Sequence, residues 1–247
     1  MRAEIVMEFT YDPGLVALSI AVAILGSFTG LVMTVGIRRV RGLEAGLRVM
    51  LGGLGIGGGV WSMHFIAMLA VVLPLRLSYS VPETMVSAIL AVIFTAIALW
   101  IVAYQKLGSM SLLLSALFLG SGIGTMHYLG MYAIRGCSLQ YSILGVGVSV
   151  LIAIQASAVA LWFTFRERGV LDTFLGAVAL GLAIASMHYT AMEATRFLRA
   201  GGVIDFQNVF NEPVLAMAIA VMLYSVCSIC LIVFAVLTFA RRPLARI

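Results

Sequence analysis

The three histidines of this chain are the side chains best suited to bind a metal, and all three lie in the same local sequence. Each follows a hydroxyl residue and a methionine, and each precedes an aromatic residue and, four positions on, a second methionine; the segments are residues 62–68, 125–131 and 186–192. Thioether sulfur favours Cu(I), and imidazole binds both oxidation states of copper. The pattern therefore predicts copper rather than zinc, calcium or magnesium, which more often bind through thiolate, carboxylate or other oxygen ligands.

The candidate ligands are the histidines and the methionines on either side of them. In a helix, a histidine and the methionine four residues later share one face, one turn apart. The methionine just before the histidine is rotated by about 100° and faces a different neighbour. The predicted ligand set is His64, His127, His188, Met63, Met68, Met126, Met131, Met187 and Met192.

The three motifs form an internal repeat. The histidines are 63 and 61 residues apart, which fits one pair of helices per repeat. Gly57, Gly120 and Gly181 stand seven residues before them, and small residues let membrane helices approach closely. We therefore expect the even-numbered helices to pack together, so that their histidines converge. One such histidine would ordinarily be a packing residue, whereas three motifs that use every histidine of the chain indicate a functional site.

The composition indicates that these helices lie in a lipid bilayer. The chain has 247 residues, of which 63% are hydrophobic and only 10% charged, and its mean hydropathy is +1.14. A soluble domain carries roughly 25% charged residues, so these charges are too few to cover a surface exposed to water. Nucleic-acid binding is excluded because no basic stretch is interleaved with aromatic residues on a soluble surface.

Apolar runs of about 20 residues predict seven transmembrane helices. They cover residues 14–37, 47–73, 84–104, 110–134, 142–165, 173–194 and 213–240. The linkers are too short to hold a soluble domain, and only seven residues follow the last span. We therefore expect an all-α integral-membrane bundle of seven helices with a threefold repeat of helix pairs, forming one domain over residues 1–247 without a soluble output domain.

The distribution of basic residues predicts the orientation in the membrane. The loops that follow the first, third, fifth and seventh spans collect 10 of the 15 basic residues. The positive-inside rule then places the N-terminus outside and the C-terminus in the cytoplasm. Each motif lies late in a span that runs outward, so we expect the metal site toward the periplasmic or extracellular side of a bacterial inner (plasma) membrane.

Five further residues are weaker candidates near the site: Trp61, Tyr128, Tyr189, Asp12 and Glu193. The two tyrosine hydroxyls could donate hydrogen bonds that orient the imidazoles. Trp61 fits either an interfacial aromatic belt or the wall of the site. The two carboxylates stand at the outer ends of helices, where they could guide cations or accept a proton, although simple solvation is the alternative.

The motifs resemble the signature of the MHYT domain, a bacterial integral-membrane sensor module. Residues 187–190 read Met-His-Tyr-Thr, and residues 11–13, Tyr-Asp-Pro, are similar to the start of that domain. The first motif departs from the signature at Phe65 and Ile66, and the second at Leu129. The resemblance covers essentially the whole chain. It implies copper bound through methionine and histidine, sensing of a diatomic gas such as O2, CO or NO, and output through a cytoplasmic signalling domain, which here would be a separate partner protein.

Two functions remain open from the sequence. The first is a copper-dependent sensor of a diatomic gas or of redox state, acting alone or as a homo-oligomer. The second is a membrane copper oxidase or oxygenase that acts on a lipid-soluble substrate, so whether the chain is an enzyme stays undecided. Haem held between histidines is a further alternative, and an intense Soret band would distinguish it from copper.

Overall fold

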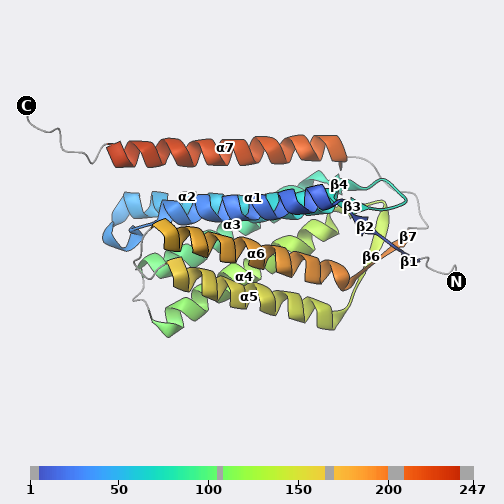
Figure 1. Cartoon of the computed structure of the whole chain (residues 1–247), viewed down its shortest axis with the longest axis horizontal. Helices are drawn as coiled ribbons and strands as arrows, with labels where there is room; N and C mark the ends of the chain where they lie inside the picture. The colour runs from blue at the N-terminus through green and yellow to red at the C-terminus, as the bar shows by residue number, and fades with distance from the viewer. Residues whose placement is uncertain (1–5, 105–107, 165–169, 200–208, 240–247) are drawn as a thin grey trace, which may run out of the picture.

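The computed structural model describes residues 6–104, 108–164, 170–199 and 209–239, and this part of the chain forms seven long helices and eight short strands (Figure 1). The helices are α1 (Pro13–Thr34), α2 (Gly42–Leu69), α3 (Val81–Tyr104), α4 (Ser109–Tyr132), α5 (Ile143–Thr164), α6 (Val170–Glu193) and α7 (Glu212–Phe239). All seven are long and apolar enough to cross a membrane. The predicted all-α bundle of seven spans is therefore confirmed.

Six of the helices form a closed ring. α1 packs against α2, α3 against α4 and α5 against α6, and contacts of α2 with α3, α4 with α5 and α6 with α1 join the three pairs. Of the described helices, α7 alone lies outside this ring, along α2 and α1 (Figure 1). The ring is thus the threefold repeat of helix pairs that the motif spacing predicts.

The glycines seven residues before the histidines fix the contact between successive pairs. The even-numbered helices meet inside the ring as expected, because α2, α4 and α6 contact one another. The glycines do not make that contact, so our expectation was wrong only in the partner it gave them. Each glycine packs on the backbone of the odd-numbered helix of the next pair, where an added Cβ would lie only 2.5–2.8 Å from a Cα atom: Gly57 on Val92, Gly120 on Ile154 and Gly181 on Ile24. A larger side chain at any of these positions would push two helices apart.

Short strands cover one end of the ring, which we call the strand end (Figure 1). They are β1 (Val6–Met7), β2 (Thr10–Tyr11), β3 (Val71–Val72), β4 (Ser78–Ser80), β5 (Ile134–Arg135), β6 (Cys137–Tyr141), β7 (Thr195–Arg199) and β8 (Val209–Asn211). They pair antiparallel in the orders β1-β7-β6, β2-β3 and β5-β4-β8. The sequence prediction treated these segments as loops and helix ends, because runs this short have no period of their own; α2, for example, ends at Leu69 so that Val71 can pair with Tyr11.

α2 is the most buried helix of the bundle. From Leu51 to Met68 every residue except Leu54 is buried, because α2 contacts α1, α3 and α7 at once. Its many glycines permit these approaches: an added Cβ on Gly59 would lie 2.7 Å from the Cα of Gly26 in α1. α2 therefore offers little freedom to the histidine near its end.

Candidate metal centre

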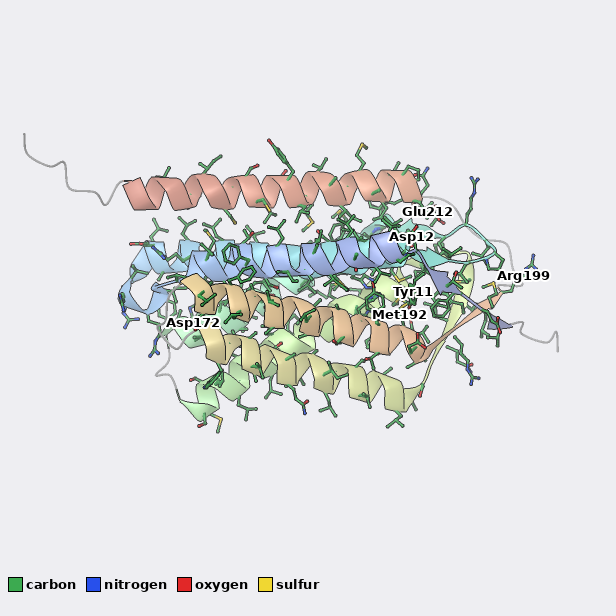
Figure 2. The ribbon with its side chains drawn as sticks, viewed as in Figure 1. Tyr11, Asp12, Asp172, Met192, Arg199 and Glu212 are labelled. Carbon is green, nitrogen blue, oxygen red and sulfur yellow. The ribbon has the colours of Figure 1, made fainter. Side chains whose placement is uncertain are left out.

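The three histidines meet in the interior of the ring. His64 in α2, His127 in α4 and His188 in α6 are fully buried, and each pair of their Nδ1 atoms is 3.2 Å apart. All three lie in the half of their helix nearer the strand end, where Figure 2 places Met192 and Tyr11, while Asp172 lies at the other end. The predicted convergence of the three imidazoles at one level is confirmed.

The protein alone does not satisfy the hydrogen bonding of this cluster. A neutral imidazole nitrogen presents either a proton or a lone pair. Two facing nitrogens can form a hydrogen bond when one carries a proton and the other a lone pair. Among three mutually facing nitrogens at least two have the same role, so at least one pair sets two protons or two lone pairs against each other. The Nε2 atoms of all three rings are also buried without a hydrogen-bond partner. Each buried unsatisfied group costs about 1–3 kcal/mol, and a cation at the centre would accept all three Nδ1 lone pairs together.

The dimensions of the triad fit a metal ion. The centre of a triangle with 3.2 Å edges lies about 1.8 Å from each Nδ1 atom, close to the metal–imidazole distance of about 2.0 Å. Haem does not fit this arrangement, because two axial nitrogens must lie on opposite faces of a macrocycle, roughly two such bond lengths apart. No carboxylate or thiolate of the described residues joins the three rings.

The motif methionines all belong to one buried core cluster. Met63, Met68, Met126, Met131, Met187 and Met192 are each no more than 1% exposed. Which of them bind a metal stays a prediction. Their burial keeps water from the imidazoles and gives the site a low-dielectric surrounding that influences both redox potential and ligand affinity.

Each histidine begins a chain of aromatic contacts that leads to the strand end. The ring of the next residue packs edge-on against the imidazole, and this second ring packs edge-on against a tyrosine of a strand. The three chains are His64–Phe65–Tyr79, His127–Tyr128–Tyr141 and His188–Tyr189–Tyr11, with ring centroids 4.7–5.8 Å apart. Burial raises the pKa of all three strand tyrosines, that of Tyr141 to about 12, so their phenols stay protonated at neutral pH.

Comparison with known proteins assigns these repeats. The MHYT family model, described as "Bacterial signalling protein N terminal repeat", matches residues 1–47, 57–115, 120–177 and 181–246. This chain belongs to the MHYT family. The last three matched segments begin at Gly57, Gly120 and Gly181, so each starts with the motif half of an even-numbered helix. The segments from Gly57 and Gly120 also include the odd-numbered helix that the glycine contacts, whereas the segment from Gly181 includes α7, and its contact α1 lies in the first matched segment.

The MHYT relatives with curated names are larger signalling proteins. The chain is 43% identical over 194 residues to the bifunctional diguanylate cyclase/cyclic di-GMP phosphodiesterase MucR of Pseudomonas aeruginosa, over 76% of this chain and 28% of the relative. It is 36% identical to the cyclic di-GMP phosphodiesterase NbdA of the same species and 32% identical to the signalling protein YkoW of Bacillus subtilis. Each of these two matches covers 77% of this chain and 25% of the relative. The chain thus spans about a quarter of their length. No solved structure matches it.

The strand tyrosines belong to a second repeat that our sequence analysis missed. Each stands two residues before an odd-numbered helix of the MHYT ring, and each is followed eight residues later by a buried serine. The pairs are Tyr11 with Ser19, Tyr79 with Ser87, and Tyr141 with Ser149. The intervals of 68 and 62 residues between successive pairs were the signal that could have revealed them.

The tyrosines of the motifs serve the helix contacts rather than the imidazoles. The hydroxyl of Tyr128 shares a 2.8 Å hydrogen bond with Ser149 of α5, and that of Tyr189 a 3.0 Å hydrogen bond with Ser19 of α1. Our prediction that these hydroxyls orient the imidazoles was wrong. One residue beyond the histidine, a helix has turned by about 100°, so the side chain faces the next helix pair.

Trp61 does not belong to an interfacial aromatic belt, and its indole N–H does not bind the histidines. It is buried between α2 and α3, where its indole N–H donates to the carbonyl oxygen of Thr84 at 3.0 Å. Its ring lies 5.1 Å from that of Phe65, which packs on His64. Trp61 therefore walls the site from behind the first aromatic ring.

The two carboxylates have positions outside the triad. Asp12 caps α1, because its Oδ1 accepts hydrogen bonds from the backbone N–H groups of Gly14 and Leu15 at 2.8 and 3.0 Å. Glu193 is exposed at the end of α6. The pKa of Tyr11 is raised by burial and also by the negative charge of Glu193. Glu193 therefore acts on the end of the aromatic chain His188–Tyr189–Tyr11.

Gly130 is a site residue that sequence reasoning did not single out. A Cβ at this position would collide with Nε2 of His64. The other two motifs have Ala67 and Ala191 at the same place. The difference between glycine and alanine within otherwise matching motifs was the only signal in the sequence.

Proposed function

We propose that this MHYT chain is the membrane-embedded sensor of a bacterial signalling system, and that a copper ion held by His64, His127 and His188 is its sensing centre. The observation that supports this most is the triangle of Nδ1 atoms, 3.2 Å apart and fully buried. A cation at the centre would bind the three Nδ1 lone pairs, which cannot all be paired with one another.

Copper fits this site better than other metals for reasons of charge and ligand type. The described residues bring no carboxylate or thiolate to the imidazoles, so the full charge of the ion stays uncompensated in a low-dielectric interior. A monovalent ion is less costly to bury than a divalent one. Cu(I) is monovalent and also suits the six buried methionine thioethers, of which Met68, Met131 and Met192 share a helix face with the histidines.

A copper ion at this site would supply an open coordination position for a diatomic gas and a change between two oxidation states. The residues of the chain hold the ion and keep water away from it. They also connect the site to helix packing, because each histidine belongs to a different helix pair of the ring. A signal requires that gas or redox state favour one arrangement of these pairs over another.

α7 would transmit such a change. His64 lies on α2, and six residues before it Gly58 faces α7, where an added Cβ would lie 3.3 Å from Cε of Met222. α7 is the last of the described helices, and the end of it that is farther along the chain lies away from the strands (Figure 1). With the C-terminus in the cytoplasm, as the basic loops predict, α7 would reach a cytoplasmic signalling protein. The relatives MucR and NbdA are named as enzymes of cyclic di-GMP, and we propose an output of that kind.

The test is metal analysis of the purified full chain in detergent. We expect copper to bind stoichiometrically to the wild type, and the triple variant His64→Ala/His127→Ala/His188→Ala to lose it. Cys137→Ser is the matched control, because Cys137 lies on β6 outside the triad and its loss should leave copper unchanged. A folded triple variant that keeps its copper, or a wild type that never binds it, would exclude the proposal.

Two further measurements separate sensing from the alternatives. A shifted infrared stretch of CO on the reduced, copper-loaded protein would support a gas-binding position. Oxygen consumption with a quinol or a membrane extract would instead favour an oxidase or oxygenase. Absence of a Soret band is expected, because the triad leaves no room for a macrocycle.

A further inference from the structure

A hollow of about 600 Å³ opens between α4 and α5 in the second repeat. Its lining includes Ser121, Gly124, Thr125 and Tyr128 of α4 and Val150 of α5. Thr125 is exposed and Ser121 is half-exposed, so the hollow opens sideways toward the bilayer. Behind its wall lies the metal centre, because the Tyr128 ring packs edge-on against that of His127 at 4.8 Å.

In the first repeat the corresponding space is filled by the protein itself. Gly124 stands three residues before His127, and Trp61 stands three residues before His64. Trp61 is buried between α2 and α3, and its indole N–H donates to a backbone carbonyl of α3. On the facing helices, Ala88 and Val150 occupy equivalent positions, nine residues after the strand tyrosine. In the first repeat the space between the two helices thus holds a planar ring with a polar atom, the indole of Trp61. In the second repeat Gly124 supplies no such ring.

The polarity and depth of the hollow restrict what can occupy it. Ser121 and Thr125 line it, and neither hydroxyl forms a hydrogen bond within the described residues. The lining runs along α4 from Tyr132, the last residue of the helix, to Ser121. Ser121 lies eleven residues from that end, about 16 Å along the helix and well inside the hydrocarbon region. Phospholipid head groups do not reach Ser121, and acyl chains offer no acceptor to its hydroxyl, whereas a carbonyl group of a molecule dissolved in the hydrocarbon region does.

We propose that this hollow binds the head group of a lipid-soluble quinone. Such a molecule is planar, dissolves in the hydrocarbon region, and has carbonyl oxygens that accept hydrogen bonds from Ser121 and Thr125. Its ring would take the place that the indole of Trp61 fills in the first repeat. The site abuts the triad through Tyr128 but needs no metal for binding, so it stands independently of the copper proposal.

The test is photolabelling of the metal-free full chain in phosphatidylcholine nanodiscs with an azido-ubiquinone analogue. We expect labelled peptides from α4 and α5, and competition by decylubiquinone but not by decylbenzene, which has the tail and a ring without carbonyls. Labelling spread evenly over the lipid-facing helices, or equal competition by decylbenzene, would overturn the proposal.

Two variants sharpen this test. Gly124→Trp/Val150→Ala copies the residue pair of the first repeat and should reduce labelling at least tenfold, because the indole fills the hollow. Thr125→Val removes one hydrogen bond at nearly constant volume and should weaken decylubiquinone competition about fivefold. The matched control is Ser186→Ala at the same motif position of α6, where the serine hydroxyl already donates to Leu182; it should change nothing.

Unchanged labelling of Gly124→Trp/Val150→Ala, together with unchanged decylubiquinone competition in Thr125→Val, would refute the site. If the double variant fails to fold, as judged by gel filtration, Thr125→Val alone decides the outcome. Copper content is measured on the same samples, so that failure of quinone binding with copper retained, or the reverse, separates this proposal from the copper proposal.

Discussion

Replacing Gly130 by alanine tests whether the triad is a precisely dimensioned metal site. The single added methyl group would overlap Nε2 of His64, and an ordinary carbon–nitrogen contact requires about 3.5 Å. The imidazole must therefore move by about 1 Å, because α4 cannot retreat: Gly120 already holds it against the backbone of α5. Coordination tolerates errors of only about 0.2 Å, so this shift removes His64 from the triangle.

We expect Gly130→Ala to lower copper affinity by about 10- to 100-fold, the range seen when the groups that position metal ligands are altered. Overpacking should also destabilise the protein by about 1–3 kcal/mol. The assay is competition with a Cu(I) chelator, together with thermal unfolding in detergent. Gly147→Ala in α5 is the matched control, since an added Cβ there meets no atom within 4 Å. Unchanged copper affinity in folded Gly130→Ala would refute the proposed geometry.

Three further predictions concern the surroundings of the triad. Tyr189→Phe removes the hydrogen bond to Ser19 and should cost about 1 kcal/mol of stability without loss of copper, as thermal unfolding and metal analysis will show. Gly57→Ala should destabilise more, by about 1–3 kcal/mol, because its Cβ would lie 2.7 Å from the Cα of Val92; equal melting temperatures would contradict this helix contact. Burial disfavours the thiolate and raises the pKa of Cys137 to about 11, so its alkylation rate should keep rising from pH 9 toward pH 11, whereas a plateau near pH 9 would disprove the burial.

Local sequence was sufficient for the membrane spans and for the identity of the histidines. Lipid imposes a length of about 20 apolar residues on every span, and a polar ring such as that of His64 is too costly in lipid to occur three times without a function. Both signals are properties of short segments, so they can be read from the printed sequence. The helix limits are not a property of short segments: α2 ends at Leu69 because the strand that follows it, β3, pairs with β2, a distant segment.

The sequence by itself determined that three similar motifs, each with one histidine between two methionines, lie at one depth of a seven-helix membrane domain. Only the tertiary structure decided which atoms meet: Nδ1 rather than Nε2 of each ring points to the centre, Tyr128 turns to Ser149, and Gly130 makes room for His64. The physical reason is that spacing along a helix fixes the direction of a side chain relative to its own axis, whereas the distance to another helix depends on how closely the backbones pack. That closeness is set by contacts between residues far apart in the chain, such as Gly120 with Ile154.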